Sequence, residues 1–282
     1  MSSVPLTVIL PARNEELNLG EALASVEWAD QRIVVDSHST DRTEVIARTA
    51  GAEVVQFEYV PGGLKKEAWA FANLDVRNDW IFLLDADERI PPALRKEIEE
   101  AIQNTAVNGY YVDRELVFMG RAMRSFRPNW NLKLVRRGHA GIEDLGLPDF
   151  DIDRDSKVHE HVVVEGEKGF LLTPLLHDDY RGLTAWLDRH NHYATWEAHL
   201  YRKFRREPIG VDPIGFLRLD AFHRKRVLRR LWVRMPFRTP IRFLVWYVGR
   251  RGFLDGREGF IFCVLMSYYE FIVGAKLREL EP

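Results

Sequence analysis

The first 105 residues alternate between short apolar runs and segments with helical spacing of apolar residues, and this alternation restricts the fold more than any other feature. The apolar runs lie at residues 6–10, 32–36, 53–57 and 80–84, and helical segments are expected near 17–26, up to about 49, 64–74 and 91–103. Four such alternations predict an α/β fold with a mostly parallel central sheet covered by helices on both faces.

A polar cluster follows three of the four apolar runs, at residues 13–16, 36–41 and 85–88. Ligands of parallel sheets bind at the carboxyl ends of the strands, so these clusters mark the expected site. The last cluster, Asp85-Ala86-Asp87-Glu88, places three carboxylates in four residues, which repel one another unless a cation or solvent compensates. A site with only one or two carboxylate ligands suits Mg²⁺ or Mn²⁺, because such an ion also binds the oxygens of a substrate diphosphate. The alternative is the acidic N-terminus of a helix.

The chain carries neither of the common glycine-rich phosphate loops. There is no G-x-G-x-x-G after the first strand and no G-x-x-x-x-G-K-[ST] anywhere. A dinucleotide-binding dehydrogenase and a P-loop nucleotidase are therefore disfavoured, and the phosphates of a bound nucleotide would require a metal.

Beyond residue 105 the pattern changes. Strands are expected at residues 109–118, 131–136 and 157–164, with a loop rich in Gly and Asp at 138–155. The chain becomes helical from Gly182, and an apolar helix at 260–275, interrupted by Glu270, is shorter than the roughly 20 residues a membrane span requires.

The net charge of −2 hides a basic block. Residues 202–251 contain 15 Lys and Arg against 3 Asp and Glu, which leaves −14 for the rest of the chain. Basic residues interleaved with Trp and aliphatics are typical of a helix lying on an anionic membrane surface, although a solvated face over an ordinary core is the alternative. The acidic remainder argues against nucleic acid as a partner. The basic side chains concerned include Arg224, Lys225, Arg226, Arg229, Arg230, Arg234, Arg238 and Arg242.

The lone Cys263 excludes a disulfide framework and a cysteine-based zinc site. No signal peptide is visible in residues 1–8. We therefore expect a cytoplasmic protein, bound peripherally to the inner face of the cell membrane.

Three motifs resemble the family 2 glycosyltransferases of GT-A fold. They are Val8-Ile9-Leu10-Pro11-Ala12-Arg13-Asn14-Glu15, Val35-Asp36-Ser37-His38-Ser39-Thr40-Asp41-Arg42-Thr43 and Leu84-Asp85-Ala86-Asp87-Glu88-Arg89. The resemblance covers residues 5 to about 110. Beyond that the chain resembles, more loosely, the bacterial subgroup that includes lipopolysaccharide-core glucosyltransferases, through Val158-His159-Glu160, Leu176-His177 and Gly252-Phe253-Leu254-Asp255-Gly256.

The resemblance implies a set of donor-site residues. Pro11, Arg13, Glu15 and Asp36 match positions that hold the uridine base and ribose. Asp85-Ala86-Asp87 matches the D-x-D signature, in which the last Asp ligates a divalent metal, Mg²⁺ or Mn²⁺, that bridges the donor diphosphate, with Asp85 nearby. Lys65 and Lys66 lie near the region that approaches the phosphates, but a solvated helix face is the favoured interpretation for them.

The family inverts the anomeric centre by direct displacement, so a carboxylate must take the proton of the acceptor hydroxyl. Glu160 is favoured because it adjoins an expected strand, and Glu143-Asp144 in the Gly-rich loop is the alternative. His177 is interpreted as structural more readily than as a metal or phosphate contact.

The sequence as a whole indicates an inverting glycosyltransferase that moves a hexose from a nucleotide-diphosphate sugar, UDP-hexose above all, to a glycolipid or lipid-linked acceptor of the cell envelope. Residues 1–205 would form the GT-A domain, with 1–105 binding the donor and 106–205 serving the acceptor and catalysis. Residues 206–282 would form a helical, basic, membrane-associating extension. A polyprenyl-phosphate sugar synthase fits the same residues. A sugar-1-phosphate nucleotidyltransferase and a non-catalytic nucleotide-sugar-binding protein are the more distant alternatives.

Overall fold

The computed structural model describes residues 3–60, 64, 66–143, 162–208 and 221–281. The chain forms two compact units, Met1–Leu183 and Thr184–Pro282. The boundary predicted at residue 205 concerns which residues serve the acceptor and the membrane, and it stays a prediction.

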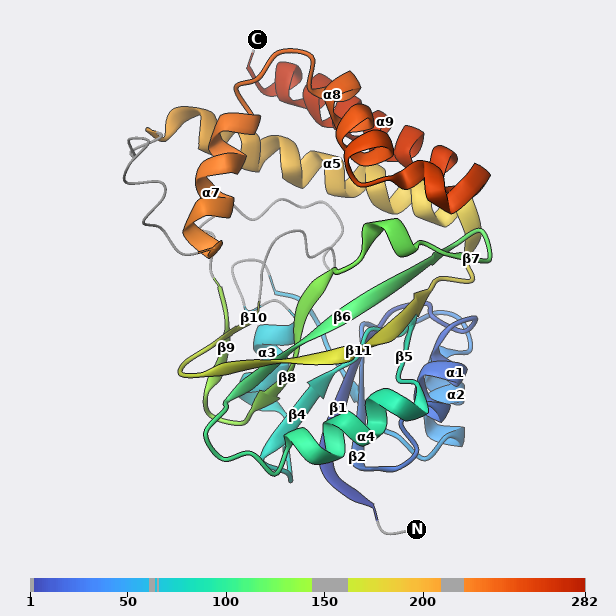
Figure 1. Ribbon diagram of the computed structural model, residues 1–282. Helices are drawn as coiled ribbons and strands as arrows, with labels where there is room; N and C mark the ends of the chain where they lie inside the picture. Colours follow the sequence, from blue (N-terminus) through green and yellow to red (C-terminus); the bar gives the residue numbers. More distant parts are fainter. Residues whose placement is uncertain (1–2, 61–63, 65, 144–161, 209–220, 282) are drawn as a thin grey trace. The chain divides into compact units, whose positions relative to one another are not determined.

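The first unit is organised around one mixed sheet, in which the described strands follow the order β3-β2-β1-β4-β8-β6-β11-β5 (Figure 1). The half formed by β1 to β4 is parallel, as the alternation in the sequence predicts. Its strands are β1 (Val4–Ala12), β2 (Ala29–Asp36), β3 (Glu53–Gln56) and β4 (Trp80–Leu83). Because β1 lies between β2 and β4, the ends of these three strands meet at one edge.

The other half of the sheet is mixed. β8 (Trp130–Arg136) runs antiparallel to β4 and to β6 (Gly109–Phe118), whereas β11 (Lys168–Asp178) runs parallel to β6. The short strand β5 (Glu88–Arg89) pairs antiparallel with β11, and β7 (Arg121–Ala122) pairs with β6 next to the 3₁₀ turn η1 (Arg124–Phe126). The sheet thereby returns to the acidic cluster after β4.

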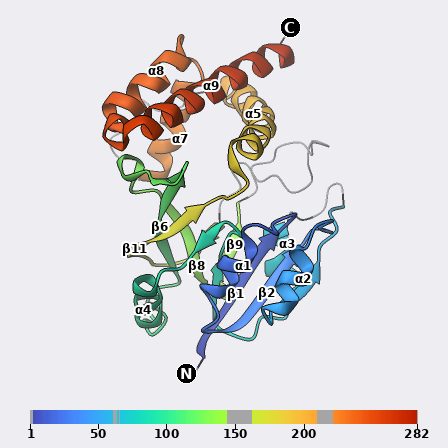
Figure 2. The same cartoon turned by 90° about the vertical axis from the view of Figure 1, so that its right-hand side faces the viewer.

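Helices cover both faces of the sheet, as expected. Buried side chains of α1 (Leu19–Ala24), α2 (Thr43–Thr49) and α4 (Pro92–Ala101) pack with one face. The other face packs against α3 (Lys66–Asn73) and the two-stranded sheet of β9 (Ala140–Ile142) and β10 (Val162–Val164) (Figures 1 and 2).

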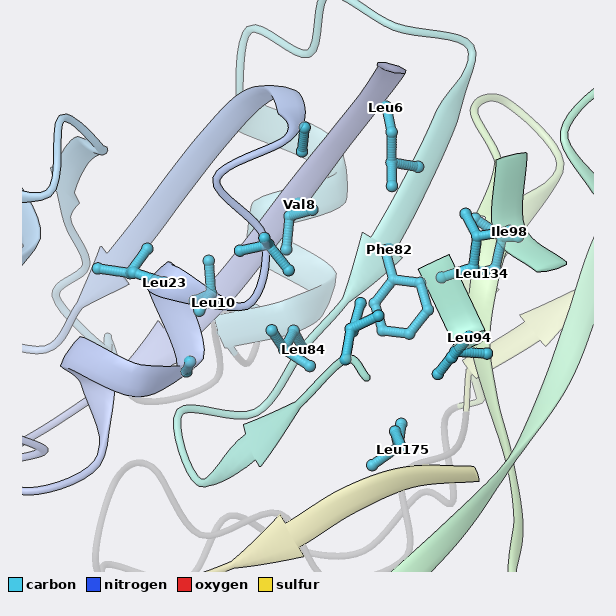
Figure 3. Packing of buried hydrophobic residues seen from close by; sticks show 14 of the residues in the cluster. Leu6, Val8, Leu10, Leu23, Phe82, Leu84, Leu94, Ile98, Leu134 and Leu175 are labelled. Atoms are coloured by element: carbon cyan, nitrogen blue, oxygen red, sulfur yellow. The ribbon is translucent and has the colours of Figure 1, made fainter. Parts of the chain in front are cut away.

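The core explains why β1 is apolar in almost every position. Leu6, Val8 and Leu10 lie in one core cluster with Phe82 and Leu94 (Figure 3). Ile9 lies in the cluster on the opposite face. Each of these side chains is fully buried. A strand in the middle of a doubly covered sheet must be apolar on both sides, and this removes the alternation seen in half-exposed strands.

Several elements differ from the sequence expectation, including the short strands β5 and β7. β9 lies inside the stretch expected to be a loop, and β11 was not predicted as a strand. The C-terminal helix α9 (Gly256–Leu280) has 25 residues, and the stretch Gly252–Leu280 is long and apolar enough to cross a membrane by composition. The expectation that this helix is too short for a span was therefore wrong, because its polar ends continue the helix beyond the apolar run.

In its described residues, the second unit consists of helices and helical turns. They are α5 (Gly182–Arg206), which begins at the end of the first unit, α7 (Ala221–Trp232), α8 (Arg238–Leu244), the π-turn η2 (Val245–Gly249), the 3₁₀ turn η3 (Gly252–Asp255) and α9.

Several arginines of the basic block are tied inside the second unit. Arg229 pairs with Glu197 at 2.8 Å, and Arg238 and Arg242 both pair with the buried Glu270, at 2.9 and 2.5 Å. These cations therefore join helices to one another, which a solvated basic face would not do.

Candidate active site

Two loops at the carboxyl end of the parallel strands interlock. Asn14, which follows β1, has a φ of 52° and accepts a hydrogen bond on its side-chain oxygen from the Thr40 amide at 2.8 Å. In return, the Asn14 amide donates to the Ser39 hydroxyl at 2.8 Å, and the Glu15 amide donates to the hydroxyl of Thr43 at 2.7 Å. Asn tolerates this left-handed backbone better than most residues. The motifs expected to hold the base and ribose are thus fixed against each other.

Asp36 is fully buried at the end of β2 and organises the turn that follows it. Its carboxylate accepts hydrogen bonds from the Ser39 amide and from the Gln56 side chain, each at 3.1 Å, and from the Ser39 hydroxyl. The acidic group that the motif places at this strand end is therefore held by its own loop.

The acidic cluster after β4 is compensated by cations of the chain itself. The Lys133 ammonium, on β8, lies 3.0 Å from the Asp85 carboxylate and 2.8 Å from the Glu88 carboxylate. Arg114, on β6, lies 3.5 Å from Glu88 and 3.8 Å from Asp85. Glu88 also accepts a hydrogen bond from the Asp85 amide at 3.0 Å, which closes the turn. The repulsion expected from sequence is thus met by side chains from two neighbouring strands.

The pKa values of Asp85 and Glu88, the two outer carboxylates of this cluster, shift in opposite directions. Burial opposes ionisation of Asp85, yet the ammonium of Lys133 lowers its pKa, so Asp85 is a carboxylate. Burial and the charge of Asp85 raise the pKa of the completely buried Glu88. The attraction of the same two carboxylates raises the pKa of Lys133 despite its burial, which keeps the ammonium charged. The cluster is a fixed arrangement of charges.

The pairing of β5 with β11 brings a further polar group to Asp87. His177 lies opposite Glu88 in the register, and the Asp178 amide donates to the Asp87 carbonyl at 3.0 Å. The His177 Nε2 atom lies 3.3 Å from the Asp87 carboxylate, and the two side chains are 19% and 13% exposed. An imidazole and a carboxylate therefore meet at a partly open position.

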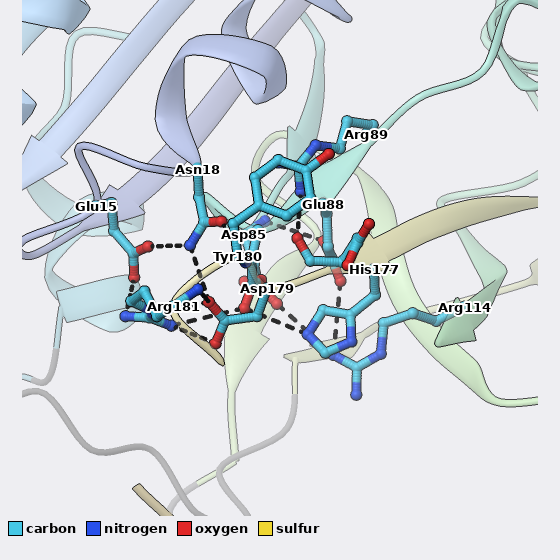
Figure 4. Close-up of polar contacts among 12 residues, drawn as sticks. Glu15, Asn18, Asp85, Glu88, Arg89, Arg114, His177, Asp179, Tyr180 and Arg181 are labelled. Carbon is cyan, nitrogen blue, oxygen red and sulfur yellow. Dashed lines mark hydrogen bonds and ion pairs between the residues drawn. The ribbon is translucent and has the colours of Figure 1, made fainter. Parts of the chain in front are cut away.

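Arg181 joins this position to the loop after β1 (Figure 4). Its guanidinium donates to Glu15 at 2.6 Å and to Asp179 at 2.8 and 3.0 Å, and it lies 3.8 Å from Asp87. The buried Asn18 donates to both Glu15 and Asp179, at 2.8 and 3.1 Å. A charged guanidinium is therefore held beside the D-x-D turn by two carboxylates.

Glu15 has an unusual electrostatic environment. Burial raises the pKa of Glu15 to about 7, although Arg181 and the Asn18 amide oppose the shift. Its side chain is 12% exposed. Since the charges of Asp87 and Asp179 also disfavour a further anion, the ionisation of Glu15 depends on the guanidinium of Arg181.

The donor atoms available for a divalent metal are the carboxylate of Asp87 and the imidazole of His177. Within the described part of the chain, no three His, Cys, Asp or Glu side chains converge as a complete metal cluster. Two protein donors nevertheless fit Mg²⁺ or Mn²⁺, because these ions keep several waters and take other oxygens from substrate phosphates. Asp85 faces Lys133, which makes it the less suited of the two Asp residues.

The remaining predicted residues have different outcomes. Pro11 lies at the end of β1, opposite Val35, and Arg13 is exposed just beyond it. Glu143 follows β9 and is half-buried, whereas Asp144, His159 and Glu160 lie outside the described residues, so the choice of base stays a prediction.

Lys66 was expected on a solvated helix face, and this was wrong. It is buried, and its ammonium donates to the Ala12 carbonyl at 3.0 Å, because α3 packs against the end of β1. Lys65 lies outside the described residues.

Sequence reasoning missed Asn18, Lys133 and Arg181. For Arg181 a signal existed, because the run His177-Asp178-Asp179-Tyr180-Arg181 is a polar cluster directly after an apolar strand, the pattern that marked the other three clusters. Lys133 and Asn18 had no such signal.

A sheet with this parallel half, followed by strands that return to a D-x-D turn at the end of β4, defines a glycosyltransferase of GT-A fold. The chain belongs to glycosyl transferase family 2, whose family model matches residues 7–154.

Several curated relatives match along nearly the whole chain, including the following two. A lipopolysaccharide core biosynthesis glycosyltransferase, LpsC, of Rhizobium meliloti (strain 1021) is 29% identical over 98% of this chain and 93% of its own length. An uncharacterized glycosyltransferase of Rickettsia conorii is 37% identical over 97% of this chain and 90% of its own length.

Among solved structures, the glucosyl-3-phosphoglycerate synthase of Mycobacterium tuberculosis in complex with Mn²⁺, uridine diphosphate and glucosyl-3-phosphoglycerate is similar to part of the chain. The two are 25% identical with a TM-score of 0.33. The match covers 40% of this chain and 44% of that enzyme, which is less than half the length of either.

Proposed function

We propose that this glycosyltransferase transfers a hexose, with inversion, from a UDP-sugar to a glycolipid acceptor of the cell envelope such as a lipopolysaccharide core. The observation that carries the proposal is the convergence of Asp87, His177 and Arg181 beside the interlocked loops after β1 and β2. A carboxylate, an imidazole and a guanidinium beside two rigid loops suit a ligand with a nucleoside at one end and a diphosphate at the other.

The nucleoside would lie against the two interlocked loops. Pro11, Arg13, Glu15 and Asp36 stand at the ends of β1 and β2, where the family motif places contacts to the uridine base and ribose. The mutual hydrogen bonds of the loops support this assignment, since a preformed site loses little conformational freedom on binding.

Asp87 and His177 would hold Mg²⁺ or Mn²⁺, with Asp85 orienting the turn through Lys133. When bound, the metal supplies positive charge against the departing diphosphate. Arg181 adds a second positive charge at the same place, and its two carboxylate partners fix the direction of its guanidinium.

Removal of the proton from the acceptor hydroxyl falls to Glu160 in this proposal, with Glu143 or Asp144 as the alternative. The carboxylate would accept the proton as the hydroxyl oxygen bonds to the anomeric carbon and the bond to the diphosphate breaks. A polyprenyl-phosphate acceptor is already an anion and needs less help from a base. Activity retained in Glu160→Gln, Glu143→Gln and Asp144→Asn alike would therefore favour the polyprenyl-phosphate sugar synthase.

The likeness to a lipopolysaccharide core biosynthesis glycosyltransferase over nearly the full length supports an envelope glycolipid as acceptor. The donor is a cytoplasmic metabolite in such a reaction, so the enzyme would work at the inner face of the cell membrane.

The first test measures UDP release from a panel of UDP-sugars in the presence of Mn²⁺, Mg²⁺ or EDTA. We expect slow hydrolysis of one donor, abolished by EDTA and lowered at least a hundredfold in Asp87→Asn and His177→Ala. Asp79→Asn is the matched control, because Asp79 adjoins the opposite end of β4 and is 83% exposed. Turnover that persists in EDTA would reject the metal, and UDP binding without turnover on any acceptor extract would favour a non-catalytic binding protein.

The second test compares Glu160→Gln with Glu143→Gln and Asp144→Asn once an acceptor extract supports transfer. Loss of turnover with intact UDP affinity identifies the base among the three. Near-wild-type turnover in Glu160→Gln would remove that residue from the mechanism.

A further inference from the structure

The surface of the second unit carries an apolar tip, which is formed by η2, η3 and the first turns of α9. Its exposed side chains include Val248 at 58%, Leu254 at 60% and Phe253 at 46% exposure. Val245 and Phe260 belong to the same tip, and Leu244, the last residue of α8, adjoins it; all three are likewise about half exposed. Apolar side chains gathered in this way on a surface mark an interaction site more often than scattered ones do.

The tip is built as a rigid structure. The aromatic rings of Phe243, Tyr247, Phe253 and Phe260 form one cluster, with ring centroids 5.2 to 6.1 Å apart. Gly259 on α9 lies so close to the Gly252 carbonyl that a Cβ added there would lie 2.1 Å from the oxygen. The turns η2 and η3 therefore pack closely against α9, and their exposed apolar side chains have fixed positions on the surface.

The exposed apolar surface continues along α9. Phe260, Val264, Tyr268 and Phe271 are all exposed and recur at intervals of three or four residues, so they share one face of the helix. The opposite face is buried in the second unit and contains Phe262, Cys263, Val273 and Leu277. The helix is thus divided into a packed face and an outward apolar face.

A buried ion-pair group argues against α9 crossing a bilayer, although its composition would allow it. Of the 18-residue apolar window, 39% is buried inside the structure. Within the helix, Glu270 is 1% exposed and pairs with Arg238 and Arg242 of α8. A spanning helix would carry these three charges into the hydrocarbon, which costs several kcal/mol even for one. The same arrangement is compatible with a helix lying in the plane of the surface.

The rim of the tip is cationic. Arg250, Arg251 and Arg257 are exposed beside η2, η3 and the start of α9, whereas the nearby Asp255 is buried and Glu258 is half-buried. Phosphate headgroups of anionic lipids complement such a rim, and arginine binds phosphate with two parallel hydrogen bonds. A second copy of the tip would bring like charges together, so the charge pattern favours a lipid surface over self-association.

We propose that the η2–η3 tip and the outward face of α9 insert into the headgroup region of an anionic phospholipid bilayer, with α9 parallel to the membrane plane. The tip makes the contact with the membrane. The arginines of α7 and α8 that pair with Glu197 and Glu270 connect helices within the second unit. The inference rests on the proposed function only for its purpose, which is to bring the enzyme to a lipid-linked acceptor.

The test is co-sedimentation of the full-length protein with liposomes of phosphatidylcholine containing one-third phosphatidylglycerol. We expect the double variant Val248→Asp/Leu254→Asp to bind at least about tenfold more weakly, because each change removes a buried apolar side chain from the lipid and adds a charge. The triple variant Arg250→Gln/Arg251→Gln/Arg257→Gln should lose the preference for anionic over neutral liposomes.

Leu228→Asp is the matched control, because Leu228 is 54% exposed on the basic helix α7 of the same unit. Equal binding of the wild type and the double variant would overturn the proposal, as would a loss caused by Leu228→Asp instead. Resistance of the membrane-bound wild type to alkaline carbonate would show a spanning helix and overturn it too. A dimer in light scattering that the double variant dissolves, without any liposome binding by the wild type, would assign the tip to self-association.

UDP release from the donor, without liposomes, distinguishes failure of this inference from failure of the proposed function. The tip variants should release UDP at the wild-type rate, since their substitutions lie outside the donor site. If the protein binds liposomes but turns over no donor, the proposed membrane contact stands and the proposed enzymatic function is rejected.

Discussion

The Arg181 guanidinium lies 2.6 Å from the Glu15 carboxylate, and this contact joins the segment after the strand β11 to the loop after the strand β1. The same guanidinium is held by Asp179 and approaches Asp87 at 3.8 Å. One cation therefore connects the loop assigned to the nucleoside with the turn assigned to the metal and diphosphate. The donor site depends on a contact between residues at opposite ends of the first unit's sequence.

Replacing Arg181 with Gln should therefore lower both activity and stability. Glu15 and Asp179 would lose their cation, and breaking a buried pair in this way costs about 3 kcal/mol. UDP release should fall at least a hundredfold because a positioned charge near the diphosphate is lost. Steady-state kinetics and urea unfolding measure the two effects.

Arg48→Gln is the control for this prediction, since the Arg48–Glu44 pair is exposed on α2 and surface pairs contribute little. An Arg181→Gln enzyme with wild-type turnover would show that the guanidinium does not act on the donor.

Lys133 should be required for folding of the acidic turn. Lys133→Met leaves Asp85 and the buried Glu88 with Arg114 as their remaining cation, and a free-energy loss of about 3 kcal/mol is expected. Glu88→Gln in the same chain should restore part of the loss, because it removes one of the two negative charges. Urea unfolding of the single and double variants measures the coupling; additive effects would contradict the pairing.

Glu270 should stabilise the second unit without affecting the donor site. Glu270→Leu leaves Arg238 and Arg242 without their shared carboxylate inside the unit, which should cost about 3 kcal/mol or more. Calorimetry should show a lower unfolding temperature, whereas the affinity for UDP, measured at a temperature where the variant is folded, should stay at the wild-type value. A weaker UDP affinity in this variant would place part of the donor site in the second unit.

His190 should make the second unit sensitive to acid. Burial lowers the pKa of His190 to about 4, and its ring stacks on Trp186 with centroids 3.5 Å apart. Because the unfolded chain binds this proton at about pH 6.5, stability is complete above that pH and falls as the pH drops towards about 4. The loss amounts to at most about 3 kcal/mol.

His190→Phe should flatten this part of the pH profile, since Phe can stack on Trp186 and does not titrate. His192→Gln, at a half-buried position two residues further on, is the control variant. Urea unfolding at pH 7.5 and pH 5 distinguishes the two; a wild-type slope in His190→Phe would assign the acid sensitivity elsewhere.

The parts of the site that lie within one stretch of sequence were predictable. The run Asp85-Ala86-Asp87-Glu88 after an apolar strand indicated a charged turn, and the polar clusters after β1 and β2 indicated the neighbouring loops. Local composition is sufficient here because a strand end and the turn after it are neighbours in the chain. The same reasoning indicated the family and the α/β fold, both of which the comparisons confirm.

The partners of that turn were not predictable in this way. Lys133 is separated from Asp85 by 48 residues and Arg181 from Glu15 by 166, and each meets its partner through strand pairing in the mixed half of the sheet. Such pairings depend on which strands become neighbours and in which register, and a single sequence does not specify this for strands that are far apart in the chain.

The sequence by itself determined the class of fold, the family and the positions of the acidic turn and its neighbouring loops. Periodicity and contiguous motifs can be recognised in a sequence without knowing which residues are in contact. Tertiary structure alone decided which charges face one another. Arg229, Arg238 and Arg242 belong to a basic block in the sequence, yet each pairs with a carboxylate inside the second unit. The physical reason is that the effect of a charge depends on the partner within a few ångströms and on the water removed around both, and folding sets these two quantities.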